Sequence, residues 1–162
     1  MPPEGSGDIL IVLDEVISEQ DFEATYLGGS IGRLLTDILK RAGLKSEDVT
    51  ITCSSACLGG SDNGKSTSAL LKQRIFNSII VLGNDGFGLL CRKSGIKDKR
   101  GQSFPIHKDH GIDANVLIWP TYGLGLVRRV PNYRNIVVAD IMRAVGQNRI
   151  AEEITWEYWT GQ

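Results

Sequence analysis

The sequence has no long apolar run, few cysteines and no basic amino-terminal segment. No apolar stretch approaches the roughly 20 residues of a membrane-spanning helix, which predicts a protein without a membrane partner. Three cysteines among 162 residues do not suit a disulfide framework and fit a reducing cytosol. Residues 1–7 are polar and lack Lys and Arg, so they predict a disordered leader and not a signal peptide. We therefore expect a cytoplasmic protein.

Three common catalytic signatures are also absent. The chain has no G-x-S-x-G elbow, no H-E-x-x-H pair and no glycine fingerprint of a dinucleotide site after its first apolar segment. These absences argue against an α/β-hydrolase, a zinc protease of that type and a Rossmann dehydrogenase.

Positive charge is missing from the first part of the chain, although the net charge is only −1. Residues 1–32 hold seven acids and no Lys or Arg, whereas residues 92–100 carry five positive charges against one negative. Arg128 and Arg129 follow later. A basic face of this kind can bind phosphates, and the alternative is an ordinary solvated surface.

Apolar segments alternate with helical patterns along the chain. Ile9–Leu13 is a continuous apolar run, typical of a strand that is covered on both faces. Further strands are predicted at 49–53, 79–82 and 116–119, the last stopped by Pro120 and followed by a loop over 121–130. Helices are predicted at 30–39, 66–76, 84–91 and 131–145. The helix at 66–76 would have Leu70, Leu71 and Ile75 on its apolar side, and Asn84 or Asp85 would N-cap the next one. Residues 92–111 are expected to be irregular. This order predicts an α/β fold, a three-layer α/β/α sandwich with a mainly parallel four-stranded sheet. We expect one domain over residues 8–146, followed by an aromatic tail at 147–162.

The first predicted strand ends at two acids, Asp14 and Glu15. Ligands in open α/β sheets bind beyond the carboxyl ends of the strands, and the long connection to Gly29 is typical of a functional loop. We therefore expect Asp14 to line a site. The alternative is a strand end that simply carries solvated side chains.

Two further motifs have weaker support. Residues 59–66 read G-G-S-D-N-G-K-S and fit a phosphate-binding P-loop ending in Lys65 and Ser66, but five residues separate them from the preceding strand. Cys53 and Cys57 could join His107 and His110 in a zinc set, yet the histidine spacing is short and a buried structural cysteine is the commoner case. We expect no metal and no cofactor.

Several short segments share their order with one known family. They are 29–35 (G-S-I-G-R-L-L), 42–44 (A-G-L), 49–57 (V-T-I-T-C-S-S-A-C), 80–83 (I-V-L-G), 100–101 (R-G) and 120–131 (P-T-Y-G-L-G-L-V-R-R-V-P). Together they make the chain similar to the uracil-DNA glycosylase superfamily, closest to its family 4- and 5-like bacterial and phage members. The similarity covers roughly residues 8–146.

The resemblance also implies roles for particular residues. The water-positioning acid of the family falls on Asp14, and Tyr26 or Tyr122 would stack on a flipped base. The residues that the resemblance assigns to base binding are Tyr26, Cys53, Tyr122 and Gly123, and those that it assigns to DNA binding are Gly29, Ser30, Arg100, Arg128 and Arg129.

The chain departs from the family where the chemistry is expected. The uracil-reading Asn falls on Cys53, which cannot supply the paired donor and acceptor of an amide. The charge-stabilising His falls on Gly123, and only Cys57 matches one of the four iron–sulfur cysteines. The resemblance therefore implies lost or altered uracil excision and no iron–sulfur cluster.

Three functions remain in competition. The first is a non-catalytic accessory protein of DNA replication or repair, which binds a modified base or single-stranded DNA. The second is an active DNA glycosylase with a changed base preference that uses Asp14 to orient water. The third is a nucleotide-binding protein that uses Lys65 and Ser66. The aromatic tail residues Trp156, Tyr158 and Trp159 would suit a protein partner, or they pack on their own domain.

Overall fold

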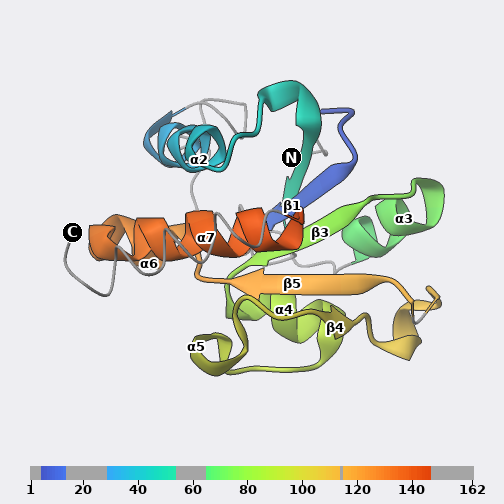
Figure 1. Ribbon diagram of the computed structural model, residues 1–162. Coiled ribbons are helices and arrows are strands. Elements are labelled where there is room, and N and C mark those ends of the chain that lie inside the picture. The colour runs from blue at the N-terminus through green and yellow to red at the C-terminus, as the bar shows by residue number, and fades with distance from the viewer. Residues whose placement is uncertain (1–4, 14–28, 54–64, 114, 147–162) are drawn as a thin grey trace.

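The structure, a computed structural model, describes residues 5–13, 29–53, 65–113 and 115–146, with the backbone alone at Lys65 and Ser66. Its centre is a five-stranded sheet in the order β2-β1-β3-β5-β4, which runs from top to bottom in Figure 1. Four strands are parallel to one another: β1 (Ile9–Leu13), β2 (Val49–Cys53), β3 (Ser78–Leu82) and β5 (Leu117–Thr121). The fifth, β4 (Phe104–Pro105), is a short antiparallel edge strand beside β5.

Helices cover both faces of this sheet, as the sandwich prediction requires. One face packs against α2 (Gly29–Arg41), α6 (Leu124–Arg129) and α7 (Arg134–Ala144). The other packs against α3 (Lys65–Gln73), α4 (Asn84–Cys91) and α5 (Ile96–Lys99). Short 3-10 helices are η1 (Ser46–Asp48), η3 (Lys108–His110) and η4 (Pro131–Tyr133).

The central strand β1 shows why an unbroken apolar run fits this fold. Its side chains alternate between the two faces of the sheet. Ile9, Ile11 and Leu13 join the core under α2 and α7, whereas Leu10 and Val12 join the core under α4. All five residues are buried, because β1 has a strand on each side and helices above and below. The strand prediction at 9–13 is confirmed.

The predicted strand count was wrong by one. The four expected strands are present and parallel, but β4 adds a fifth within 101–111, a segment expected to be irregular. β4 has only two residues, one of them Pro105, so the sequence has no alternating apolar and polar pattern from which this strand could be predicted. The backbone N–H of Ile106 donates to the carbonyl of Val116, which continues this pairing beyond the strand.

Pro120 does not end β5, contrary to the prediction. The strand continues through Thr121, whose carbonyl accepts a hydrogen bond from the Gly83 N–H on the β3 side. The Pro120 carbonyl faces the other side, where it accepts from the Gly101 N–H at 3.3 Å. The N–H and C=O of one strand residue point to the same side, so the N–H that proline lacks would also have faced away from β3. The short β4 does not extend alongside Pro120, and the proline therefore removes no hydrogen bond from the sheet.

Other boundaries also differ from the predictions. Residues 121–130 were expected to form a loop, yet 124–129 are the helix α6, and α5 lies in the basic segment expected to be irregular. Helix α3 ends at Gln73, so Ile75 is 94% exposed and does not belong to the buried side assigned to it. The N-cap of α4 is Gly83, with no side-chain cap from Asn84 or Asp85.

Two residues of the predicted disordered leader, Gly5 and Gly7, are tied to the domain. The carbonyl of Gly5 accepts from the Arg74 guanidinium at 3.5 Å. The carbonyl of Gly7 accepts hydrogen bonds from the Thr50 hydroxyl at 2.7 Å and from the Arg74 guanidinium at 3.0 Å. A side chain at Gly7 would collide with the backbone of Asp48, which lies 2.0 Å from the position of its Cβ. Packing therefore begins before Asp8.

Across the described residues, we find no helix with the length and apolar character needed to cross a membrane.

Candidate functional site

A cavity of 340 Å³ opens at the carboxyl ends of β3 and β5. In Figure 1 these strand ends lie on the left, where the arrow of β5 points and where α5 and α6 are found. Three segments form its wall: the turn from β3 into α4, the start of α5, and the turn from β5 through α6. The lining residues are Gly83, Asn84, Asp85, Ile96, Lys97, Tyr122, Gly123, Leu126 and Arg129.

Two hydrogen bonds hold these segments in place. Gly83 has a φ of +118°, a value that suits glycine, and its N–H donates to the Thr121 carbonyl at 2.9 Å. This bond keeps the ends of β3 and β5 together while their chains turn away. The side-chain oxygen of Asn84 accepts from the Ile96 N–H at 3.3 Å, which fixes the start of α5 over the cavity.

The cationic side chains at this edge are exposed and unpaired. Among the residues that the structure describes, Lys97, Arg128 and Arg129 have no ion-pair partner. Lys97 is on α5, and the two arginines form the last turn of α6. Asp85 is the one carboxylate among the lining residues. The cavity thus combines cations that can bind an anion with the aromatic ring of Tyr122.

A buried ionic network supports the cavity wall from behind. Asp140 on α7 is 2% exposed and accepts from the Arg100 guanidinium at 2.8 Å and the Thr121 hydroxyl at 2.6 Å. Arg143 approaches the same carboxylate at 3.9 Å. Burial raises the pKa of Asp140, and the Thr121 hydroxyl and Arg100 oppose this shift. The network fixes Thr121, the residue that precedes Tyr122.

Glycine suits residue 101, which follows Arg100 and lies against the ionic network. Its φ is +74°, and an added Cβ would lie 2.6 Å from an Arg143 guanidinium nitrogen and 3.0 Å from an Asp140 carboxylate oxygen. A side chain at residue 101 would therefore push the two charged groups apart. The pair Arg100-Gly101 serves the packing of α7 on β5, a role that the sequence pattern alone does not reveal.

The ring of Tyr122 already has an aromatic neighbour. It stacks on Tyr133 with ring centroids 4.8 Å apart and an interplanar angle of 13°. The Arg100 guanidinium carbon lies 6.0 Å from the Tyr122 centroid. Tyr133 covers one face of the ring, so a base that stacked on Tyr122 would have to use the other face.

The predicted site residues separate into groups. Tyr122, Gly123 and Arg129 line the cavity, Arg128 is adjacent, and Arg100 lies behind the wall. Gly29 and Ser30 begin α2, and Cys53 ends β2, so the structure does not place these three among the cavity residues. Sequence reasoning missed Lys97 and Asp140. The signal for Asp140 was a single acid within the apolar run Ile136–Met142.

Other predicted residues lie outside the described part of the chain. They are Asp14, Tyr26, Cys57, Trp156, Tyr158 and Trp159. The backbone of Lys65 and Ser66 begins α3, and residues 54–64 separate this helix from the end of β2. The water-positioning, P-loop and aromatic-tail hypotheses therefore stay predictions.

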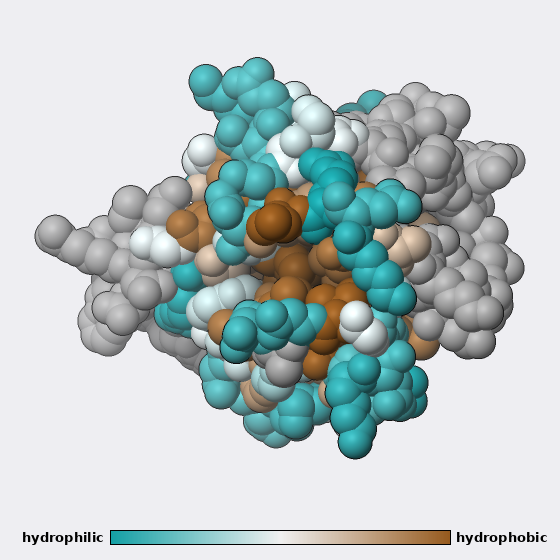
Figure 2. Space-filling view, turned by 90° about the vertical axis from the view of Figure 1, so that its right-hand side faces the viewer, coloured by the Kyte–Doolittle hydropathy of each residue, from teal (hydrophilic) through white to brown (hydrophobic). Residues whose placement is uncertain are grey.

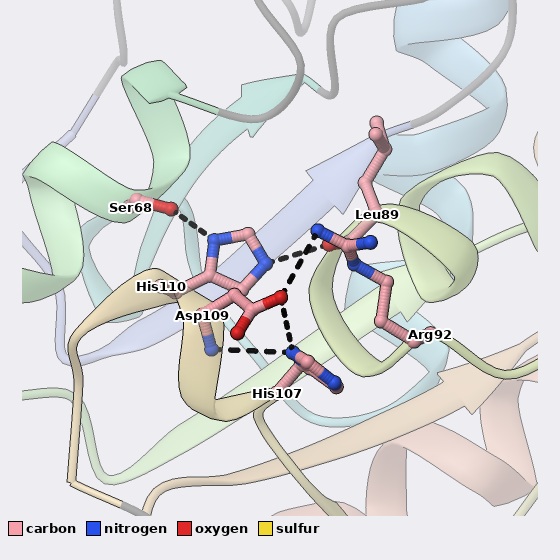
Figure 3. Close-up of polar contacts among 6 residues, drawn as sticks. All are labelled: Ser68, Leu89, Arg92, His107, Asp109 and His110. Atoms are coloured by element: carbon pink, nitrogen blue, oxygen red, sulfur yellow. Dashed lines mark hydrogen bonds and ion pairs between the residues drawn. The ribbon is translucent and has the colours of Figure 1, made fainter.

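A second polar cluster surrounds the two histidines (Figure 3). His110 uses both ring nitrogens: Nδ1 faces the Ser68 hydroxyl at 2.7 Å and Nε2 faces the Leu89 carbonyl at 2.6 Å. The Leu89 carbonyl can only accept, so Nε2 carries a proton and donates to it, and the Ser68 hydroxyl pairs with Nδ1. Nδ1 of His107 accepts from the Asp109 N–H at 3.2 Å. This cluster joins α3, α4 and η3.

The same cluster offers little to a metal ion, because the nitrogens of His110 are already bonded. In the part of the chain that the structure describes, no three His, Cys, Asp or Glu side chains gather around a common point suited to a metal. Burial raises the pKa of the Cys91 thiol to about 12, so Cys91 is a packed side chain and not a nucleophile.

The side of the molecule where β5 begins has a different character. Figure 2 shows this side, on the right of Figure 1, with apolar residues gathered at its centre and hydrophilic residues around them. Leu117, the first residue of β5, is 44% exposed. The charged cavity is thus a feature of the opposite end, the carboxyl ends of the strands.

Comparison of the chain with models of known protein families and with curated proteins gave no match.

Proposed function

We propose that this protein binds DNA at the carboxyl ends of β3 and β5, as a uracil-DNA-glycosylase-like accessory protein with lost or altered uracil excision. The observation that carries the proposal is the convergence of Lys97, Arg128 and Arg129, three cations with no ion-pair partner among the described residues, beside a cavity with an aromatic wall. Carboxyl strand ends are the usual ligand side of an open α/β sheet.

The charge arrangement supports a nucleic-acid ligand. Arg128 and Arg129 are exposed in the last turn of α6, so both guanidinium groups can reach phosphates without breaking an ion pair to any residue that the structure describes. Each neutralised phosphate releases counterions, which supplies sequence-independent affinity. The guanidinium fork also matches the geometry of a phosphate.

The residues at the resembled catalytic positions favour an accessory role over ordinary uracil excision. Gly123 is the N-cap of α6 and offers only its backbone where the family has a charge-stabilising His. Cys53 offers a thiol in place of an amide. Loss of one electrostatic stabiliser costs about 100- to 1,000-fold in rate in typical sites. The active glycosylase with Asp14 as its water-positioning acid remains the alternative.

Oligonucleotide binding and excision assays test the proposal. We expect single- or double-stranded oligonucleotides to bind at low salt, and Arg128→Ala/Arg129→Ala to weaken the binding of all sequences alike. A screen of duplexes with modified bases should yield no abasic product. Absence of binding at low salt would contradict the DNA proposal.

An abasic product would instead favour the glycosylase alternative. In that case Asp14→Asn should abolish the product and leave DNA affinity unchanged or stronger, because it removes an anion from a site that binds phosphates.

A further inference from the structure

We infer that the cavity between α4, α5 and α6 binds the phosphate monoester of a nucleotide, at a phosphorylated DNA end or in a free mononucleotide. This inference rests on the proposed function, because it names the part of a nucleic acid that enters the cavity. The remainder of the DNA would lie along Arg128, outside the lining residues.

The charges in the cavity suit a terminal phosphate. Lys97 comes from α5 and Arg129 from α6, so cations lie on two of the three segments that form the wall. A phosphate monoester carries about −1.5 to −2 charges at pH 7, whereas an internal phosphodiester carries one. Lys97 and Arg129 have no ion-pair partner among the described residues, and two such cations gain more from a monoester than from the continuous backbone.

The remaining wall suits the other parts of a nucleotide. Ile96, Leu126 and the Tyr122 ring provide apolar and aromatic surface for a sugar or a base. The side-chain oxygen of Asn84 is held by the Ile96 N–H, so the amide NH₂ is the part of Asn84 that can donate to a ligand oxygen. A volume of 340 Å³ is at the scale of small-ligand sites.

The wall of the cavity is held by the protein's own hydrogen bonds. It combines the β3–α4 turn, the start of α5 and the β5–α6 segment. The wall is fixed by the Gly83 to Thr121 hydrogen bond and by the Asn84 to Ile96 hydrogen bond, so the site is formed before the ligand arrives.

The test compares one single-stranded oligonucleotide with a 5′-phosphate, a 3′-phosphate or hydroxyl groups at both ends. We expect about tenfold tighter binding of one phosphorylated form, the value of a charge-assisted contact to the second phosphate charge. Lys97→Gln should remove this preference. Lys40→Gln is the matched control, because Lys40 is exposed in the last turn of α2 and does not line this cavity.

A deoxynucleoside 5′-monophosphate and its nucleoside serve as competitors, with unfolding curves to confirm that both variants fold. Equal affinity for all three ends, with DNA binding still dependent on Arg128 and Arg129, would overturn the monoester site and leave the proposed function intact. Lys97-dependent binding of the monophosphate without any oligonucleotide binding would support the cavity assignment and overturn the DNA proposal.

Discussion

The cavity edge and the histidine cluster both collect polar side chains from several elements, but they differ in how those side chains are paired. In the histidine cluster, both nitrogens of His110 are bonded within the protein. At the cavity edge, Lys97 and Arg129 face solvent without an ion-pair partner among the described residues. Histidines and cations can both bind ligands, so residue type alone does not distinguish the two places. The pairing indicates a packing role for the cluster, and it supports the binding role that we propose for the cavity.

The largest expected effect on stability comes from the network behind the cavity. Asp140→Ala removes the carboxylate that holds Arg100 and Thr121, and leaves a mostly buried guanidinium without compensation. Loss of one partner of a buried pair typically costs 3–5 kcal/mol, and we expect about 3 kcal/mol because Arg100 retains some contact with water. Urea unfolding measures the change.

The isosteric variant Asp140→Asn separates the charge from the hydrogen bonds. Asn can still accept from Thr121, so we expect a loss of about 1 kcal/mol. If both variants lost the same free energy of unfolding, the hydrogen bond that Asn retains would contribute nothing and the charge of Asp140 would account for the whole effect.

The pH dependence of these two proteins gives a further prediction. Burial raises the folded-state pKa of Asp140 above its unfolded value, so the protonated form favours folding. Its stabilising contribution is complete below the ordinary pKa of Asp, about 4, and is lost as the pH rises through the higher folded-state value. The unfolding free energy of the wild type relative to Asp140→Asn should therefore increase from pH 7 to pH 4. A decrease over the same range would mean that Arg100 outweighs burial.

The histidine cluster should affect stability and leave binding unchanged. His110→Ala leaves the Ser68 hydroxyl and the Leu89 carbonyl without their partner, which should cost about 2 kcal/mol. Ser68→Ala removes one of the two bonds and should cost about 1 kcal/mol. Neither variant should alter DNA affinity under folding conditions. A large loss of affinity in folded Ser68→Ala would give the cluster a role beyond packing.

The smallest expected effect is at Ile75. Its side chain is 94% exposed in the connection between α3 and β3, so Ile75→Ser should change the free energy of unfolding by less than about 0.5 kcal/mol. The matched variant Leu70→Ala, in the buried part of the same predicted apolar side, should cost about 2–3 kcal/mol. Similar losses at both positions would contradict the end of α3 at Gln73.

Much of the fold follows from the sequence, because β1 and β3 bury both faces and appear as apolar runs, and β2 is rich in β-branched residues. β4 and α6 could not be predicted in this way. β4 is too short to show a period, and α6 is a six-residue helix in a segment with two glycines, Gly123 and Gly125. The prediction that Pro120 ends the strand was wrong, because a proline interrupts a sheet only where its missing N–H would have bonded to a neighbouring strand.

The candidate site was predictable only in part. The resemblance pointed to Tyr122 and Arg129, which line the cavity. The rule that ligands bind at carboxyl strand ends was applied to Asp14, which lies outside the described residues. In the sequence, Lys97 is one of several cations in a basic segment. Only the fold brings it to the same cavity as Arg129. Asp140 lies 19 residues from Thr121 in the chain, so their contact depends on the packing of α7 against β5.

The most direct test of the central claim is the salt dependence of DNA affinity in two double variants with the same loss of charge. Arg128→Ala/Arg129→Ala changes the cavity edge, and Lys40→Ala/Lys45→Ala removes two exposed lysines near the start of β2. We predict that the slope of log affinity against log salt flattens by up to about 1.8 in the arginine variant and stays at the wild-type value in the lysine variant. An unchanged slope in the arginine variant, or an equal change in both, would contradict a DNA-binding face at the carboxyl ends of β3 and β5.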